Sequence, residues 1–181
     1  MKKMTNIYLI GLMGVGKTTI GKQLAKALKC PFYDSDKVIE ELAGTDIPTI
    51  FCYEGEAGFR QREQKVIKDL TDLSGIVLAT GGGSILKPEN RAALKSSGFV
   101  VYLHCSIDKI LYRTRHDTQR PLLQTDNPRQ RLQNLLSERE PLYLECADIK
   151  IDSGTLSNKT IVKTILQQFQ SIQKDYESTP R

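Results

Sequence analysis

Short apolar runs alternate along this chain with segments whose apolar residues recur at helical spacing. The apolar runs predict strands over residues 7–10, 31–34, 76–80, 99–103 and 148–152. Their apolar residues are continuous rather than alternating, which is typical of parallel strands that are buried on both faces. Strands that alternate with helices predict an α/β fold in three layers, with a five-stranded parallel sheet between the helices.

The segments between the strands carry the signals of helices. In the first of them, Ile20, Leu24, Ala27 and Leu28 are spaced to form one inward stripe. Capping residues and helix-starting prolines support several of the other boundaries. We predict helices over residues 17–29, 37–42, 58–70, 88–95, 107–115, 128–139 and 158–174.

Two further segments lack a clear period. Residues 114–127 are polar and irregular, and a loop of that length in a compact domain is often a mobile lid. We expect residues 175–181, after the last helix, to be frayed. With no Pro/Gly/Ser-rich linker in the sequence, we treat residues 1–181 as one domain.

Composition is that of an ordinary globular protein. The 181 residues are 39% hydrophobic and 26% charged, and no apolar run approaches the length of a membrane helix. The basic N-terminus precedes too few apolar residues for a signal peptide, so we predict a cytoplasmic protein without a membrane partner. The four cysteines have no metal-binding spacing, which predicts free thiols.

The net charge of +5 suits either a nucleic-acid-binding protein or an enzyme that handles polyanions. Arginines crowd between Arg113 and Arg139, with prolines and acidic residues among them, and form no basic stripe along one helix. Aromatic residues are not interleaved with them, as they are in proteins that bind single strands. We therefore predict small polyanionic substrates and no nucleic acid.

A phosphate-binding motif follows the first strand. Residues 11–18, G-L-M-G-V-G-K-T, match G-x-x-x-x-G-K-[ST], and we call them the phosphate loop. Its glycines let backbone N–H groups face the phosphates, and the following helix adds its positive N-terminal end. Lys17 is then expected at the β- and γ-phosphates of a nucleoside triphosphate, with the Thr18 hydroxyl on Mg²⁺.

Asp34 and Asp36 follow the second strand, at the sheet edge where α/β proteins bind ligands. The third strand ends in glycines, without the carboxylate that often accompanies the metal, so Asp34 is the best candidate to hold Mg²⁺ directly or through water. Asp36 could orient an acceptor hydroxyl and take its proton. Alternatively, Asp36 could simply cap the helix at residues 37–42.

Other candidates are three glycines and three arginines. Gly81, Gly82 and Gly83, the glycine loop, suggest that a ligand approaches the backbone closely, although a flexible turn would use the same residues. Arg60, Arg120 and Arg139 could each be solvated, but together they suit an anionic acceptor, because a guanidinium fork matches a carboxylate or phosphate. Arg120 lies in the expected lid and could reach the transferring phosphoryl group.

Taken together, these motifs resemble the shikimate kinases along almost the whole chain. The phosphate loop alone indicates only a superfamily, whereas the spaced set is specific. The matching segments are G-L-M-G-V-G-K-T-T at residues 11–19, F-Y-D-S-D at 32–36, E-G-E-A-G-F-R at 54–60, L-A-T-G-G-G at 78–83, R-P-L-L at 120–123 and S-E-R-E-P-L-Y at 137–143.

The resemblance implies a phosphate-loop domain of the nucleoside-monophosphate-kinase type. It also implies transfer of the ATP γ-phosphoryl group to the 3-hydroxyl of shikimate, a step of aromatic amino acid biosynthesis. On the acceptor side, Asp36 would be the base, and Arg60, Arg139 and the glycine loop would hold shikimate.

On the nucleotide side, the resemblance implies that Lys17 and Arg120 stabilise the phosphoryl group and that Mg²⁺ lies at Thr18 and Asp34. Arg113 and residues 152–155 would line the adenine. The residues expected to contact ATP are Gly14, Val15, Gly16, Lys17, Thr18, Thr19, Arg113 and Arg120. We expect a monomer.

Two alternatives remain open at this point. A gluconate or nucleoside-monophosphate kinase would share the fold and much of the charge pattern. A nucleotide-binding module without catalytic activity would keep the phosphate loop but would not need Asp36.

Overall fold

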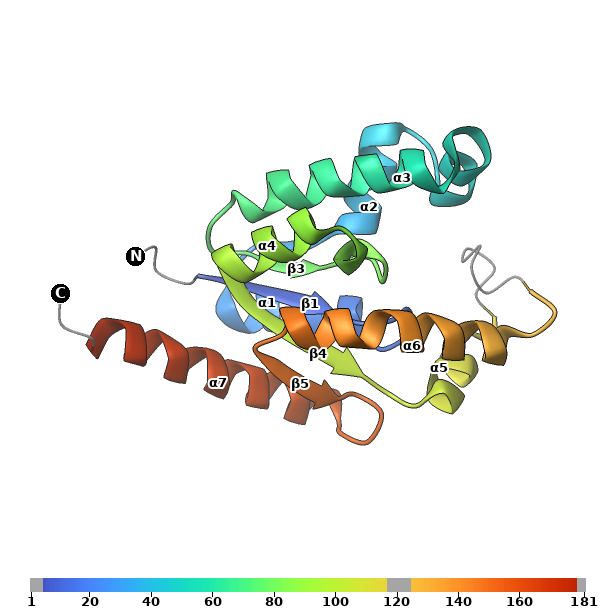
Figure 1. Cartoon of the computed structure of the whole chain (residues 1–181). Helices are drawn as coiled ribbons and strands as arrows, with labels where there is room; N and C mark the ends of the chain where they lie inside the picture. Colours follow the sequence, from blue (N-terminus) through green and yellow to red (C-terminus); the bar gives the residue numbers. More distant parts are fainter. Residues whose placement is uncertain (1–4, 117–124, 179–181) are drawn as a thin grey trace.

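The structure is a computed structural model, and it describes residues 5–116 and 125–178. Its centre is a parallel sheet of five strands in the order β2-β3-β1-β4-β5 (Figure 1). Every predicted strand is confirmed to within one residue at each end. The strands are β1 Asn6–Ile10, β2 Phe32–Asp34, β3 Val77–Ala79, β4 Gly98–His104 and β5 Ile149–Asp152.

The central strands are more deeply buried than the two edge strands. All of β1 and β3 and nearly all of β4 are buried, as their continuous apolar runs predict. The edge strand β2 is half-buried throughout, and β5 exposes Lys150 and Asp152. The expectation of burial on both faces is therefore wrong for the two edges, where a strand has a neighbour on one side only.

Helices cover both faces of the sheet, which confirms the three-layer α/β fold. Helices α4 and α6 lie in front of the sheet in Figure 1 and contact β4, while α1 lies behind it beside α7. The helices are α1 Lys17–Leu28, α2 Ser35–Ala43, α3 Ile47–Thr71, α4 Pro88–Ser97, α5 Ile107–Thr114, α6 Pro128–Cys146 and α7 Asn158–Ser178, and the short 3₁₀ helix η1 spans Ser84–Leu86.

Two helices near the N-terminus differ from the prediction. In α1, Ile20 and Leu24 are buried as expected, but Ala27 is exposed and Ala25 takes its place in the stripe. Helix α3 begins at Ile47, well before the predicted start at residue 58, and Gly55 interrupts it with φ 68° and ψ −176°. This left-handed residue breaks the helical period, which is why the sequence indicated only the second part.

Helix α6 also runs further than expected. Arg139 was predicted to close it, but the helix continues past Pro141 to Cys146. A proline inside a helix costs about 3 kcal/mol because one hydrogen bond is lost and the ring clashes with the preceding turn. The burial of Tyr143 and Cys146 on the inward face offsets this cost and places Tyr143 one turn after Arg139.

The expected lid and tail are only partly described. Thr114 ends α5, Asn127 caps α6, and residues 117–124, with Arg120 among them, lie outside the described residues. Helix α7 continues to Ser178, so the expected frayed tail is helical up to that residue. No helix in the described part of the chain combines the length and apolar character that a bilayer crossing requires.

Candidate active site

The phosphate loop joins β1 to α1. Gly14 and Gly16 have φ values of 78° and 102°, a left-handed conformation that other residues rarely adopt, and Gly16 directly precedes the first residue of α1. Lys17 lies folded against its own loop, where Nζ donates to the carbonyl oxygens of Gly11 at 2.7 Å and Leu12 at 2.8 Å. The helix N-terminus and its lysine therefore face the same region, as an anion site requires.

A cleft of about 940 Å³ opens beside this loop. It brings most of the expected nucleotide-side residues together with Asp34, the last residue of β2, and Asp36 of α2. Among its lining residues are Gly14, Val15, Gly16, Lys17, Thr18, Thr19, Asp34, Asp36, Thr80, Gly82 and Arg113. Residues that are distant in the sequence thus meet beyond the carboxyl ends of the parallel strands.

Asp34 accepts hydrogen bonds from residues of both α1 and α2. Its Oδ2 accepts a hydrogen bond of 2.7 Å from the Thr18 hydroxyl, and its Oδ1 accepts one of 3.1 Å from the Asp36 backbone N–H. Asp34 is therefore the N-cap of α2, which begins at Ser35, and the alternative that Asp36 caps a helix starting at residue 37 is wrong. The Asp36 side chain lies in the first turn of α2 and lines the cleft.

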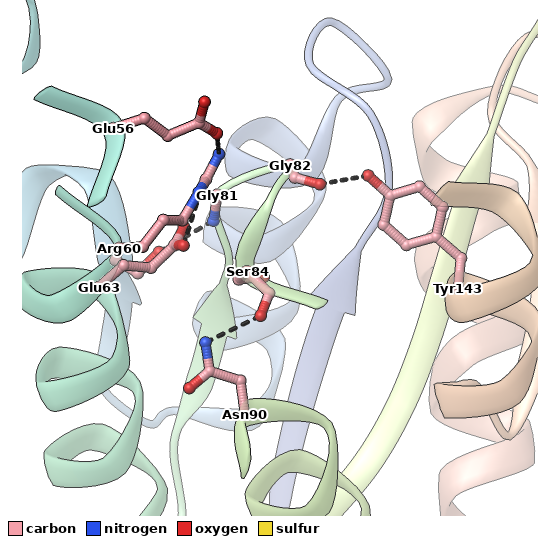
Figure 2. Close-up of polar contacts among 9 residues, drawn as sticks. Glu56, Arg60, Glu63, Gly81, Gly82, Ser84, Asn90 and Tyr143 are labelled. Carbon is pink, nitrogen blue, oxygen red and sulfur yellow. Dashed lines mark hydrogen bonds and ion pairs between the residues drawn. The ribbon is translucent and has the colours of Figure 1, made fainter. Parts of the chain in front are cut away.

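Arg60 is held in place by two carboxylates. It is 8% exposed, and it donates to Glu63 at 2.7 Å and to Glu56 at 3.2 Å, both from the same helix (Figure 2). Glu63 is fully buried, and this burial raises the pKa of its carboxyl group, against the opposing positive charges of Arg60 and Arg139. Our sequence reasoning missed Glu63, although its i+3 spacing from Arg60 indicates a shared helix face.

Arg139 carries buried donors without acceptors. The residue is 3% exposed, and its Nε and Nη1 atoms have no hydrogen-bond partner among residues 5–116 and 125–178. Buried donors in this state are costly, and a guanidinium group with two of them suits an anionic ligand. The Nη1 atom lies 3.7 Å from the position that a Cβ atom on Gly82 would take, so Arg139 adjoins the glycine loop.

The glycine loop is compact because side chains approach it closely. None of its three glycines has a positive φ, so space and not backbone conformation is the constraint. A Cβ atom on Gly81 would lie 2.6 Å from Asp36 Oδ1 and 2.9 Å from Glu63 Oε1, and one on Gly83 would overlap the guanidinium group of Arg60. The flexible-turn alternative does not fit a loop packed in this way.

Arg113 connects the phosphate loop with the segment after β5. It donates to the carbonyl oxygens of Gly14 at 3.2 Å, Val15 at 3.3 Å and Ser153 at 2.9 Å. The buried Ser153 hydroxyl also donates to the Val15 carbonyl oxygen at 2.6 Å. Ser153 thus contacts the phosphate loop, and the expectation that residues 152–155 line the adenine stays a prediction.

Comparison with known proteins decides the family. The sequence profile "Shikimate kinase" matches residues 13–170. The chain belongs to the shikimate kinase family. It is 55% identical over 170 residues to the shikimate kinase of Methylococcus capsulatus, covering 94% of this chain and 95% of that protein.

Solved structures agree with this assignment. A shikimate kinase from Acinetobacter baumannii in complex with shikimate is 48% identical, with a TM-score of 0.90 and coverage of 93% of this chain and 94% of that one. A gluconokinase from Sinorhizobium meliloti has a TM-score of 0.59 at 16% identity, covering 99% of this chain and 100% of that one, and shows the shared fold alone.

Within this shikimate kinase fold, the expected site residues come from seven separate segments, of which Arg113 lies beside the phosphate loop. The structure brings the phosphate loop, Asp34, Asp36 and the glycine loop to one region, with Arg60 and Arg139 against the glycine loop. Arg120 lies outside the described residues. The sequence reasoning also missed Tyr143, although it stands in the S-E-R-E-P-L-Y segment.

Proposed function

We propose that this chain transfers the γ-phosphoryl group of ATP to the 3-hydroxyl of shikimate, forming ADP and shikimate 3-phosphate in aromatic amino acid biosynthesis. The arrangement of Arg60, Arg139 and the glycine loop carries the proposal. Two buried guanidinium groups adjoin this loop, and Gly82 in its middle lines the same cleft as the phosphate loop and Asp36. An acid with a carboxylate and a nearby hydroxyl fits between them.

On the nucleotide side, the main-chain N–H groups of residues 14–19 hold the phosphates. Lys17 exchanges the carbonyl oxygens of its own loop for the β- and γ-phosphates when ATP binds. Arg113 borders the nucleotide from the side of residues 152–155. Arg120 stabilises the transferring group from the lid.

Mg²⁺ is proposed at Thr18 and Asp34. Their side-chain oxygens lie 2.7 Å apart at the edge of the cleft, and hydroxyl and carboxylate oxygens are ligands that Mg²⁺ accepts. No group of three His, Cys, Asp or Glu side chains suited to a metal occurs within residues 5–116 and 125–178. Thr18 and Asp34 alone suit a cation that takes most of its ligands from phosphates and water, as Mg²⁺ does. When bound, Mg²⁺ would neutralise charge on those phosphates.

Asp36 is the proposed base. Its Oδ1 atom lies 2.6 Å from the position that a Cβ atom on Gly81 would take, and Asp36 lines the same cleft as the phosphate loop. A carboxylate there orients the attacking hydroxyl and accepts its proton. Asp36→Asn should therefore keep its ATP affinity, measured by calorimetry, and lose turnover by about two orders of magnitude or more. Near-normal turnover would remove Asp36 from this role.

A coupled assay of ADP release, run with shikimate and with gluconate, tests the choice of acceptor. We expect turnover with shikimate alone. Turnover of gluconate but not shikimate would overturn the proposal, and ATP binding without turnover of either acid would favour a module that lacks catalytic activity.

Three finer expectations belong to the same proposal. Arg120→Ala should reduce kcat more than shikimate affinity, and an unchanged kcat would exclude Arg120 from the transfer step. We propose a monomer, which light scattering after size-exclusion chromatography would test. A cytoplasmic location can be tested by cell fractionation.

A further inference from the structure

Tyr143 lies next to two of the proposed acceptor residues, Arg139 and Gly82. It follows Arg139 by one turn of α6 and is fully buried. Its ring stacks on Tyr102 of β4, with the ring centres 4.9 Å apart and the planes at 20°. A stacked, buried ring has little freedom to move, so the position of its hydroxyl group is set by the sheet and by α6.

The hydroxyl group of Tyr143 donates a hydrogen bond to the Gly82 carbonyl oxygen, across the gap between α6 and the glycine loop (Figure 2). Burial raises the pKa of this hydroxyl well above its ordinary value, and the charge of Arg139 and its hydrogen bond to the hydroxyl only partly oppose this. Tyr143 therefore stays protonated, and remains a donor, at any pH at which the enzyme would be used.

Other side chains anchor backbone groups in the glycine loop and at Ser84, the residue that follows it. The Gly81 N–H donates to the Ser35 hydroxyl at 2.9 Å, and Asn90 donates to the Ser84 carbonyl oxygen at 2.8 Å. Ser35 belongs to α2 and Asn90 to α4, whereas Tyr143 ties the loop to α6, the helix that carries Arg139. The hydrogen bond from Tyr143 thus sets the loop relative to this arginine.

We infer that Tyr143 is a positioning residue for the acceptor. Its hydroxyl holds the Gly82 backbone at the distance from Arg139 that the carboxylate-bearing substrate needs. This inference rests on the proposed function, because it assumes that the acid binds between Arg139 and the glycine loop. Among the described residues, Tyr143 is not one of those that line the cleft beside the phosphate loop, so we expect the loss of its hydroxyl to affect acceptor binding more than ATP binding.

Steady-state kinetics of Tyr143→Phe test the inference. The variant keeps the stacked ring and removes the one donor to Gly82. We expect the KM for shikimate to rise about tenfold, the factor that corresponds to one lost buried hydrogen bond, while kcat and the KM for ATP change by less than about twofold. An unchanged KM for shikimate, or an equal rise of both KM values, would overturn the inference.

Two further variants separate positioning from general damage. Tyr102→Phe removes the hydroxyl group of the stacking partner, which lies near Glu140 rather than Gly82, and should leave both KM values unchanged. A chain with 4-aminophenylalanine at position 143 keeps a donor on the ring and should recover the KM of the wild type. The 4-aminophenylalanine variant also provides a test if Tyr143→Phe does not fold. A raised KM for shikimate in the 4-aminophenylalanine variant would count against the inference.

The wild type is measured in the same assay, which distinguishes the two possible failures. If the wild type does not turn over shikimate, the proposed function fails. If the wild type is active and Tyr143→Phe matches it in every constant, only the role of Tyr143 fails.

Discussion

Replacement of Arg60 by alanine should destabilise the protein mainly through the carboxylate that it leaves behind. Arg60 is 8% exposed and Glu63 is fully buried, and their charged atoms are 2.7 Å apart. Removal of one partner of such a pair leaves a buried charge without its counterion, which is among the costliest changes in a protein interior.

The expected magnitude follows from this burial. Breaking a buried pair by removing one partner costs about 3–5 kcal/mol. Arg139 also lies near enough for its charge to act on Glu63, so we expect the lower end, about 3 kcal/mol, at pH 8. This is a large part of the roughly 5–15 kcal/mol that holds a typical domain folded.

A second substitution separates the stranded charge from the lost arginine. Glu63→Gln keeps the size of the side chain and removes its charge, so Arg60→Ala combined with Glu63→Gln should recover at least about 1 kcal/mol relative to Arg60→Ala alone. Shikimate affinity should stay low in the double variant, because the guanidinium group is still absent. The free energy of unfolding would then depend on the stranded charge of Glu63, and shikimate affinity on the guanidinium group of Arg60.

The pH dependence gives an independent check on the same reasoning. Burial already raises the pKa of Glu63, and loss of the opposing Arg60 charge should raise it further. A carboxyl group whose pKa is raised on folding contributes stability below the ordinary pKa of 4.5, and this contribution is lost as pH rises through the folded-state value. The deficit of Arg60→Ala relative to the wild type should therefore be larger at pH 8 than at pH 5.

Urea unfolding followed by far-ultraviolet circular dichroism measures these free energies for the wild type, both single variants and the double variant. The reasoning would be refuted if the effects of the two substitutions were simply additive at pH 8. It would also be refuted if the deficit of Arg60→Ala became smaller as pH rises, because the stranded carboxylate would then not be the cause.

Three other predictions concern the nucleotide and acceptor sides separately. Thr18→Val removes the hydroxyl that donates to Asp34, and it should raise the Mg²⁺ concentration needed for half-maximal turnover about tenfold; an unchanged Mg²⁺ titration would contradict the proposed metal site. Gly81→Ala places a methyl group 2.6 Å from Asp36 Oδ1, and it should raise the KM for shikimate about tenfold while ATP affinity is kept. A variant with wild-type kinetics would show that the Asp36 side chain can move aside without loss of function. Arg113→Ala loses three hydrogen bonds to carbonyl oxygens and should raise the KM for ATP about tenfold, with that for shikimate as the internal control.

Much of the donor side could be predicted from the chain alone, because its determinants are neighbours in sequence. The phosphate loop places its glycines, lysine and threonine within eight residues, between a strand and a helix that hydrophobic periodicity indicates. Asp34 ends its strand and Asp36 comes two residues later, and the parallel order of the sheet brings the carboxyl ends of the strands to one edge.

The acceptor side depends on contacts between distant segments. Tyr143 and Gly82 are 61 positions apart, and their hydrogen bond requires α6 to continue past Pro141, against the local preference of proline. Likewise, Glu63 lies close to Gly81 only because α3 packs against η1, the 3₁₀ helix that directly follows the glycine loop. Propensity and periodicity act over a few residues, whereas the meeting of these side chains is decided by how whole elements bury their apolar faces, and that depends on the entire chain at once.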